Sequence, residues 1–394
     1  MAALPLPLPV PVPRKPPGSA QYNWLTGGYE SAPEQMELAL EWPAQETPGP
    51  DESIQLLATE SGTQLLVSGF GISLGKKGER VTLRLKHKSC GELPLYRLQE
   101  IVLLGHGISI STDLIADACE RGIRIAVLNF GGRPAALLTS PFLSATVETR
   151  RRQLAAAGQP VGADFIRWVA AGKLHNQEKL LRYFAKSRDG DSRRRLEDAA
   201  GSLLKLRRQA LAVEGDSVES VRPSVLGCEG AGGRVYWSAI SAILPGALGF
   251  RGRVHYQPDD PVNAALNYGY GILYSHVWGA VLNAGLEPFA GFLHGDRSGK
   301  PSLVLDLVEE FRQPAVDRPL FAWLTKGGDL RVQGGLLDGP SREEVASRVL
   351  LRLNAVEPHR GKRHQVRSII QMQARLAASA FRGEREYRPF AFKW

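Results

Sequence analysis

The hydrophobic pattern of this chain changes type near residue 146, and this change most limits the folds open to it. Between residues 61 and 145, apolar residues come in short runs or alternate with polar ones, which is typical of β-strands. From residue 146 onward they recur with the period of an α-helix. The sequence therefore predicts an α+β fold, with a small β-rich N-terminal domain at 61–145 followed by a larger all-α domain at 146–394.

Glycine-containing turns divide the first part into short strands. We expect strands at residues 63–74, 80–88, 100–105, 123–129 and 135–139. The segment 111–122 begins with a serine and ends with a glycine, the residues preferred at the two ends of a helix, so it predicts one helix among these strands.

The second part contains long segments of helical composition, at residues 149–186, 192–213 and 261–284. The last begins at a proline and stops before Gly285, which are typical helix boundaries. Four polar side chains recur along one side of it: Asn263, Asn267, Tyr270 and Tyr274.

Residues 1–60 are rich in Pro, Glu, Gly and Ser, and predict a mostly irregular extension with room for one short helix at 33–42. Seven prolines among the first 17 residues exclude the helical core of a signal peptide. They favour an extended polyproline II tether instead.

Composition limits the classes of partner and compartment. Lys and Arg number 49 against 40 Asp and Glu, and the resulting net charge of +9 favours polyanionic partners without identifying one. The cysteines Cys90, Cys119 and Cys228 are odd in number and lack metal-clip spacing, which fits a reducing cytoplasm and argues against a zinc site. No run of eighteen uncharged apolar residues occurs, so we expect no membrane span.

An acidic group on an otherwise apolar segment is the most unusual local feature. Residues 291–314 read GFLHGDRSGKPSLVLDLVEEFRQP, with His294 on a glycine-flanked loop before the acidic run. If the run is helical, four polar residues share an arc of roughly 100° on a helix that is apolar elsewhere: Asp306, Glu309, Glu310 and Gln313. Like charges one turn apart repel each other, and a bound cation would relieve that repulsion.

Two simpler interpretations of this acidic window remain open. The window could face water, and Glu309 could pair with Arg312 on the next turn. In either case no ligand would be needed.

A further acidic residue, Glu229, stands in a run of small residues, GCEGAGGRVYWSAI at 227–240. Small neighbours leave room for a bulky group or for a phosphate close to the backbone, although a glycine-rich helix start with a surface glutamate has the same sequence. If Glu229, His294 and one or two of the later carboxylates meet, these oxygen ligands with one imidazole suit Mg²⁺ or Mn²⁺ better than zinc. Such ions assist phosphodiester chemistry.

These segments resemble the CRISPR-associated integrases of spacer acquisition, the "Cas one" family. The similarity is carried by the segment NAALNYGYGILYSHVWGAVLNAGLEPFAGFLHGDRSGKPSLVLDLVEEFRQP at 263–314. It continues in EGAGGRVYWSAI at 229–240 and in LYRLQEIVLLGHGISISTDLIADACERGIRIAVLNFGGRPAALL at 95–138, and spans roughly residues 63–380.

The resemblance implies a β-rich domain that dimerises and an α-helical catalytic domain. It implies that Glu229, His294 and Glu309 hold Mg²⁺ or Mn²⁺, with Asp306 as a supporting carboxylate and Glu310 beside the site. The implied reaction is transesterification, in which the 3′-hydroxyl of a captured DNA fragment attacks a phosphodiester at the boundary of a CRISPR repeat. General-base action by His294 is the lesser interpretation.

The resemblance also implies partners. They are double-stranded DNA, a second copy of the chain and a small ferredoxin-like adaptation protein, "Cas two". Residues 1–60 depart from the family core, and their composition resembles linkers that join this domain to a reverse transcriptase in some systems.

Sequence-independent DNA binding requires clustered cations. Candidates are Arg84, Lys86 and Lys88 in the β-rich part, the arginine runs at 150–152 and 193–195, and a basic C-terminal segment with Arg360, Lys362, Arg363 and Arg367. Solvated helix faces carry similar runs.

Two other functions fit the same residues. One is a metal-dependent endonuclease acting on branched or single-stranded DNA with water as the nucleophile. The other is a DNA-binding subunit without catalytic activity.

Overall fold

The structure is a computed structural model that describes residues 21–23, 28–30, 53–59, 62–132, 134–140, 147–254, 258–296 and 298–393. The helix expected at 33–42 lies outside them. The chain divides into two compact units, Met1–Gly49 and Pro50–Trp394. In the first, the strands β1 (Gln21–Asn23) and β2 (Gly28–Glu30) pair antiparallel. The second unit contains the site described below.

The described strands of the second unit form four sheets. They are β3 (Ser53–Thr59), β4 (Gly62–Ser68), β5 (Ile72–Lys77), β6 (Arg80–Leu85), β7 (Lys88–Pro94), β8 (Leu98–Leu104), β9 (Ser109–Ile110), β10 (Arg124–Leu128), β11 (Pro134–Leu138), β12 (Val332–Gln333), β13 (Leu336–Leu337), β14 (Val356–His359) and β15 (Lys362–Gln365).

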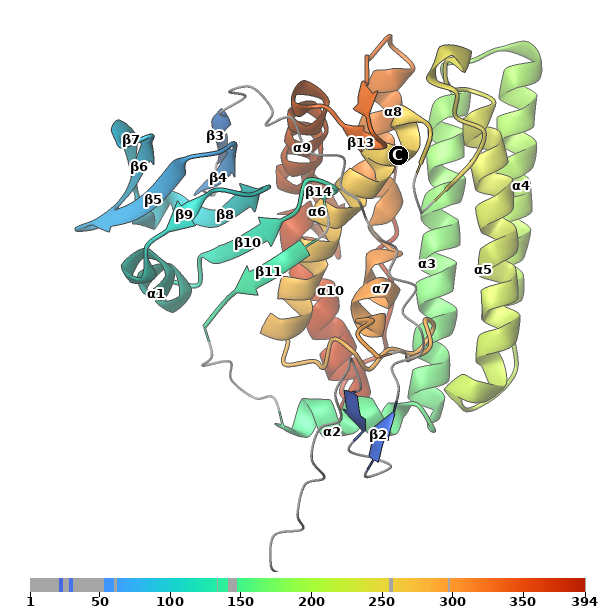
Figure 1. The fold of residues 1–394 in the computed structure, drawn as a ribbon. Coiled ribbons are helices and arrows are strands. Elements are labelled where there is room, and N and C mark those ends of the chain that lie inside the picture. The colour runs from blue at the N-terminus through green and yellow to red at the C-terminus, as the bar shows by residue number, and fades with distance from the viewer. Residues whose placement is uncertain are drawn as a thin grey trace, which may run out of the picture. The chain divides into compact units, whose positions relative to one another are not determined.

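The helices fill most of the chain after residue 146 (Figure 1). They are α1 (Thr112–Glu120), α2 (Val147–Ala156), α3 (Pro160–Ala185), α4 (Gly190–Leu211), α5 (Val218–Ser241), α6 (Pro261–Asn283), α7 (Ser302–Val308), α8 (Arg318–Leu324), α9 (Gly339–Asn354) and α10 (Val366–Phe381), with the 3₁₀ turns η1 (Leu95–Arg97) and η2 (Gly246–Leu248) and the π-helix η3 (Gln313–Asp317).

Two sheets make up the β-rich part. One has the order β11-β10-β8-β4-β3, in which β4, β8 and β10 run parallel, and the other has the order β7-β6-β5-β9. Side chains alternate across β4: Leu65 and Val67 pack with the second sheet and α1, whereas Leu66 joins the core of the helical part. The five-stranded sheet is therefore buried on both faces at β4.

The β-rich part differs from the prediction in several respects. The strand expected at 80–88 ends at Leu85, and β7 begins at Lys88. β3 pairs antiparallel with β4 from Ser53 onward, so the sheet begins before the predicted boundary at residue 61. The strand expected at 63–74 is two strands, because Gly69 and Gly71 have φ angles of 111° and 82° and turn the chain between β4 and β5.

The predicted helix boundaries are confirmed at α1 and α6. The hydroxyl of Ser111 accepts a hydrogen bond from the backbone N–H of Leu114, and Gly122 follows the helix with a φ of 72°. α6 begins at Pro261 and stops before Gly285, which has a φ of 74°.

Helices α3, α4 and α5 run side by side (Figure 1), and α6 is buried among α7, α9 and α10. The predicted α+β class is therefore confirmed, with a β-rich part ahead of a mostly helical one. The helical part is not free of strands, since β12–β13 and β14–β15 are short hairpins. No described helix is long and apolar enough to cross a membrane.

The β-rich and helical parts meet closely at α6. A Cβ on Gly271 would lie 1.6 Å from the carbonyl oxygen of Gly132, so only glycine allows this approach. Beside it, Arg124 donates to the carbonyl of Ser275 at 2.8 Å and pairs with the buried carboxylate of Glu100. Arg124 therefore links the β-rich part to α6, with its charge offset by Glu100.

Candidate active site

Glu229, His294 and Glu309 line one cavity of about 440 Å³ within the helical part. Glu229 lies in the middle of α5, His294 lies on the loop between α6 and α7, and Glu309 directly follows α7. Three segments far apart in the sequence therefore place their side chains around the same space.

A lysine from α3 lies between the two carboxylates. The ammonium of Lys173 contacts Oε1 of Glu229 and lies 2.6 Å from Oε2 of Glu309, and its side chain is only 13% exposed. Burial by itself would lower the pKa of Lys173, but the charges of Glu309 and Glu229 raise it overall. The lysine is therefore cationic.

Glu309 is ionised because cations surround it. Burial favours its neutral form, but Arg312, Lys173 and His294 lower its pKa to about 2. Arg312 donates from Nε to Oε1 of Glu309 at 3.0 Å, so the pairing expected one turn along the segment is present. Both oxygens of Glu309 thus contact a cation.

His294 is held in one orientation by Asp306. Its Nδ1 lies 2.8 Å from Oδ1 of Asp306, and its Nε2 lies 3.9 Å from Oε1 of Glu309. Burial would lower the pKa of His294, but the hydrogen bond and the charge of Asp306 raise it overall. A carboxylate on one ring nitrogen, with the other nitrogen directed to the site, is the usual arrangement of a metal-binding histidine.

Asp306 also fixes the loop that carries the histidine. It accepts hydrogen bonds from the backbone N–H groups of Phe292, Leu293 and His294 at 2.7, 3.0 and 2.8 Å. Its side chain is fully buried and does not line the cavity. Asp306 therefore positions His294 from outside the cavity.

Glu310 faces away from the cavity. Its carboxylate accepts hydrogen bonds from the hydroxyl of Tyr387, the amide of Gln373 and the backbone N–H of Phe390, which anchors the C-terminal segment. Burial raises the pKa of Glu310 to about 7. This residue is a structural anchor.

The prediction that the acidic side chains share one face of a helix is wrong. Asp306, Glu309 and Glu310 are at most 2% exposed, which also excludes the interpretation that they face water. They point in three directions: Asp306 toward the loop of His294, Glu309 into the cavity, and Glu310 toward the C-terminal segment. α7 ends at Val308, and residues 309–311 form a turn before η3. The prediction had assumed a regular helix throughout.

An aromatic and acidic network supports Arg312. Its guanidinium lies 4.5 Å from the ring centre of Tyr270, and the hydroxyls of Tyr270 and Tyr236 donate to the two oxygens of Asp317 at 2.5 and 2.6 Å. Two more members of the polar row on α6, Asn263 and Asn267, accept hydrogen bonds from Arg253, which lines the cavity.

Two buried amides that line the cavity lack hydrogen-bond partners among the described residues. They are Gln177 on α3, through its Oε1, and Gln313 in η3, through both of its polar atoms. An unpaired buried amide is costly, so a bound molecule or water is needed to satisfy these groups.

The donor set fits a hard divalent ion. Two carboxylates and one imidazole oriented by Asp306 are ligands that Mg²⁺ and Mn²⁺ accept. As the side chains stand, no three His, Cys, Asp or Glu groups in the described ranges lie close enough together to hold a metal, because Lys173 separates Glu229 from Glu309.

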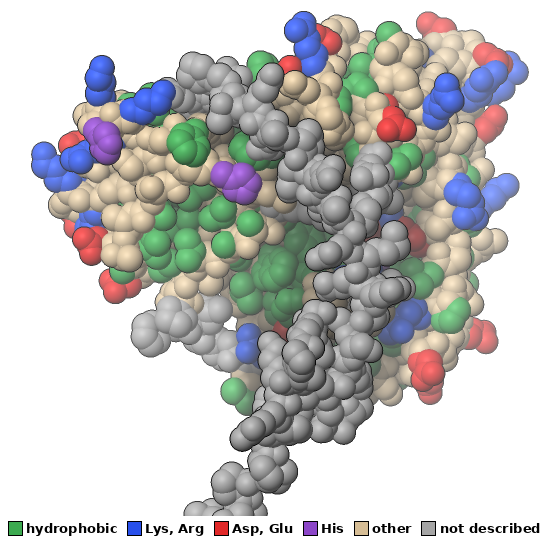
Figure 2. Space-filling view, viewed as in Figure 1, with side chains coloured by type: hydrophobic (Ala, Val, Ile, Leu, Met, Phe, Trp, Pro, Cys, Tyr) green, Lys and Arg blue, Asp and Glu red, His purple; other side chains and the backbone are tan. Residues whose placement is uncertain are grey.

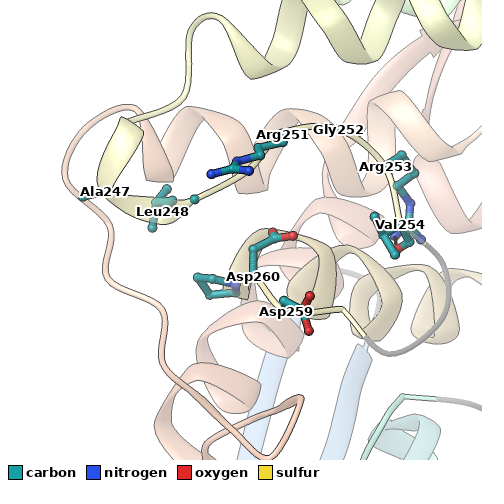
Figure 3. A pocket seen from close by; sticks show the side chains of 10 residues that line it. Ala247, Leu248, Arg251, Gly252, Arg253, Val254, Asp259 and Asp260 are labelled. Carbon is teal, nitrogen blue, oxygen red and sulfur yellow. Dashed lines mark hydrogen bonds between the residues drawn. The ribbon is translucent and has the colours of Figure 1, made fainter.

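A second cavity, of about 690 Å³, shares Arg253 with the first. Figure 3 shows Arg251 and Arg253 on the segment that leads to α6, with Asp259 and Asp260 at the start of that helix. Asp260 caps α6 by accepting from the backbone N–H of Asn263 at 2.8 Å. This cavity therefore has both cationic and acidic walls.

The predicted DNA-binding residues lie in several places. Arg84 and Lys86 are exposed at the β6–β7 turn, and Arg360, Lys362 and Arg363 are exposed on the β14–β15 hairpin. Arg367 is separate from them, half-buried in the junction near Glu100 and Arg124. The arginines at 193–195 pair with acids of their own helix, Asp191 and Glu197.

Sequence analysis missed Lys173, although a signal was present. Phe165, Val169, Leu180 and Phe184 are buried on α3, and Lys173 stands four residues after Val169 in that apolar stripe. A charged residue at such a position predicts a buried counter-charge. Arg253 and Gln177 gave no comparable signal.

Comparisons with known proteins give a consistent result. A family model described as "CRISPR associated protein Cas1" matches residues 65–331. A protein of Archaeoglobus fulgidus named "CRISPR-associated endonuclease Cas1 1" is 33% identical over 350 residues, which cover 84% of this chain and 100% of that one.

Two solved structures have a similar fold. A casposase bound to an integration product gives a TM-score of 0.70 at 20% identity, covering 83% of this chain and 93% of that one. A chain of a Cas6-RT-Cas1–Cas2 complex gives a TM-score of 0.67 at 21% identity, covering 86% of this chain and 37% of that one.

Proposed function

Because this chain belongs to the family of CRISPR-associated Cas1 proteins, we propose that it inserts captured DNA fragments into a CRISPR array by metal-dependent strand joining. The observation that carries the proposal is the convergence of Glu229, His294 and Glu309 on one cavity. Substrates are the captured duplex and the repeat DNA. The free thiols of Cys90, Cys119 and Cys228 are in keeping with the cytoplasm.

Glu229, Glu309 and Nε2 of His294 would hold Mg²⁺ or Mn²⁺. Such an ion acts as a Lewis acid on the scissile phosphate and lowers the pKa of the attacking hydroxyl. The side chains of the protein contribute the positions of these donors. Asp306 keeps the proton on Nδ1 of His294, so that Nε2 presents its lone pair to the cavity.

In the proposed reaction the 3′-hydroxyl oxygen of the fragment forms a bond to phosphorus at the repeat boundary. The bond from that phosphorus to the 3′-oxygen of the flanking strand breaks. The hydroxyl proton passes to solvent, and the leaving 3′-oxygen takes up a proton from solvent to become a hydroxyl. One phosphodiester replaces another, so no covalent protein intermediate is needed. Arg253 and Arg312 supply positive charge at the cavity where the phosphate would lie.

Partners follow from the same proposal. A second copy of this chain would join through the β-rich part at 61–145, while 146–394 would form the catalytic domain. A small ferredoxin-like "Cas two" protein would assemble with that dimer. Support for this partner comes from the similar chain in a Cas6-RT-Cas1–Cas2 complex. A reverse transcriptase is a further candidate partner.

Hydrolysis is the second candidate function, because the curated relatives are named endonucleases. The same site would then direct water at branched or single-stranded DNA. A subunit without catalytic activity is the third candidate, and the presence of all three ligand residues argues against it.

A strand-joining assay tests the proposal. A labelled duplex with free 3′-hydroxyls is incubated with a repeat-bearing plasmid and Mg²⁺ or Mn²⁺, with and without the small partner. We expect joined product that requires the metal, and none from a duplex with blocked 3′ ends. Cleavage without joining would favour the nuclease.

Ligand variants supply the matching control. Glu229→Ala and His294→Ala should each reduce joining by about a hundredfold or more, since they remove groups that stabilise the transition state. DNA binding should be retained. Joining at the wild-type rate by either variant would refute the assignment of these residues.

A further inference from the structure

We propose that the ammonium of Lys173 takes the cation position of this site when no divalent ion is present, and that the ion and the lysine exchange places. This inference rests on the proposed function. It assigns Lys173 as the residue that sets the metal affinity of the site and couples metal binding to DNA binding.

The first support is the placement of the ammonium between the two carboxylates. It contacts Oε1 of Glu229 and Oε2 of Glu309, which come from different helical segments. These are oxygens that a divalent ion would need. An ammonium that lies between these two oxygens occupies the place of the ion and would repel it, so the two cations compete for this position.

The second support is the charge balance around Glu309. Lys173 and Arg312 together offset Glu229 and Glu309, so the four groups that touch each other are neutral as a set. A divalent ion added to this set would be repelled by the two buried cations. One cation therefore has to leave when the ion arrives.

The third support decides which cation moves. Arg312 is fixed on two sides, since its Nε donates to Glu309 at 3.0 Å and its guanidinium stacks on Tyr270. Within the part of the chain that the structure describes, Lys173 pairs with the two carboxylates alone. Its flexible stem borders the cavity of about 440 Å³, so the lysine has room to turn.

The released ammonium remains in the cavity where the DNA phosphate would lie. It would then pair with that phosphate, so that DNA holds the lysine away from the carboxylates. By linkage, DNA would strengthen metal binding, and metal would strengthen DNA binding by the same factor.

The direct test measures Mn²⁺ affinity by calorimetry. The samples are the full chain alone and the chain with a duplex whose 3′ ends are blocked, so that no reaction occurs. Without DNA, Lys173→Met should bind Mn²⁺ about tenfold more tightly than wild type, within the usual range of such couplings. Addition of DNA should strengthen Mn²⁺ binding less in this variant than in wild type.

Two variants serve as controls. Lys179→Met, on the same helix, removes a lysine paired with Glu178 outside the cavity, and should leave Mn²⁺ affinity unchanged. Lys173→Arg keeps the positive charge and should not bind more tightly than wild type. Equal or weaker Mn²⁺ binding by Lys173→Met would overturn the inference.

A measurement on wild-type protein covers the case in which Lys173→Met does not fold. Acylation of lysines by an amine-reactive ester is followed by mass spectrometry. Lys173 should react slowly in metal-free protein and several-fold faster with Mn²⁺, because its ammonium is released, while Lys179 serves as the internal standard. An unchanged rate at Lys173 in protein that binds Mn²⁺ would contradict the exchange.

The two proposals fail in different ways. If wild type joins DNA with Mn²⁺ but neither Lys173 experiment gives its expected result, only the exchange is wrong. If wild type binds no Mn²⁺ with or without DNA, both the metal-dependent function and the exchange are wrong.

Discussion

At the scale of single residues, buried carboxyl groups near the cavity differ in charge because their nearest cations differ. Glu309 contacts Lys173 and Arg312, which hold its pKa at about 2 despite complete burial. For Asp317, burial outweighs the hydrogen bonds from Tyr236 and Tyr270 and the nearby arginines, and raises the pKa to about 6. Direct contact with a cation therefore decides which carboxylate stays ionised at neutral pH.

Asp317 should make stability depend on pH. Its pKa in the folded protein, about 6, lies above the ordinary value of 3.8, so its stabilising contribution is present at low pH and is lost as pH rises through about 6. Asp317→Asn removes this effect. Between pH 4 and 7, the unfolding free energy of the variant relative to wild type should rise by roughly 2 kcal/mol.

Urea denaturation of both proteins across this pH range measures the difference. Other titrating groups are common to both proteins and cancel. Parallel pH profiles for Asp317→Asn and wild type would exclude a raised pKa at Asp317.

At the scale of elements, the distance between α3 and α5 determines whether the site forms. A Cβ on Gly232 would lie 2.1 Å from Cδ2 of Leu174 and 3.3 Å from Cδ2 of Leu203, both buried. Glycine at this position lets α5 approach α3, which brings Glu229 to Lys173. The glycine-rich run that was read as room for a ligand also serves close helix packing.

Gly232→Ala should therefore weaken both the fold and the site. Overpacking between α3 and α5 should lower the unfolding free energy by about 1–3 kcal/mol, and should weaken Mn²⁺ binding by moving Glu229. Thermal or chemical denaturation and calorimetry give the two quantities.

Gly227→Ala, on an open face of the same helix, is the matched control. It should stabilise the protein by up to about 1 kcal/mol through helix propensity. If Gly232→Ala behaved like this control, the close approach of α3 and α5 would not depend on that glycine.

Sequence patterns predicted the elements where local signals were strong. Ser111 and Gly122 delimited α1, and Pro261 and Gly285 delimited α6. The segment after Val308 was predicted incorrectly as a continuation of one regular helix, because residues 309–311 form a turn and the π-helix η3 begins at Gln313.

The candidate site could be predicted only in part. Residue types and family resemblance indicated Glu229, His294, Asp306 and Glu309. In the structure Glu229, His294 and Glu309 line one cavity, and Asp306 contacts His294 from outside it. Lys173 could not be assigned, because its partners lie 56 and 136 residues away and pair only in the folded chain. The apolar stripe of α3 indicates that Lys173 has a buried counter-charge, but it does not identify which residues supply it.

At the scale of the whole molecule, the net charge of +9 is not gathered into one continuous patch on the face seen in Figure 2. The β14–β15 hairpin offers one compact group. Its turn residues Arg360 and Gly361 have φ angles of 50° and 80°, typical of a tight type I′ turn, so Lys362 and Arg363 follow on a short rigid strand.

Replacement of Arg360, Lys362 and Arg363 by alanine together should weaken DNA binding and flatten its salt dependence. Each phosphate contact contributes about 0.9 to the slope of log affinity against log salt, so the slope should fall by up to roughly 3. Affinity measured at several salt concentrations gives this slope.

The arginines at 193–195 form the comparison set for that experiment. They are already paired with Asp191 and Glu197, so their replacement by alanine should change the slope less. If the hairpin variant had the same salt slope as wild type, the hairpin would not be part of the DNA-binding surface.

The central claim is that Glu229, His294 and Glu309 share one divalent ion. The most direct measurement is the anomalous scattering of Mn²⁺ in crystals of the protein with DNA whose 3′ ends are blocked. We predict one strong peak coordinated by both carboxylates and by Nε2 of His294, with the ammonium of Lys173 displaced from it. An active protein whose only Mn²⁺ peaks lie away from these three side chains would contradict the account.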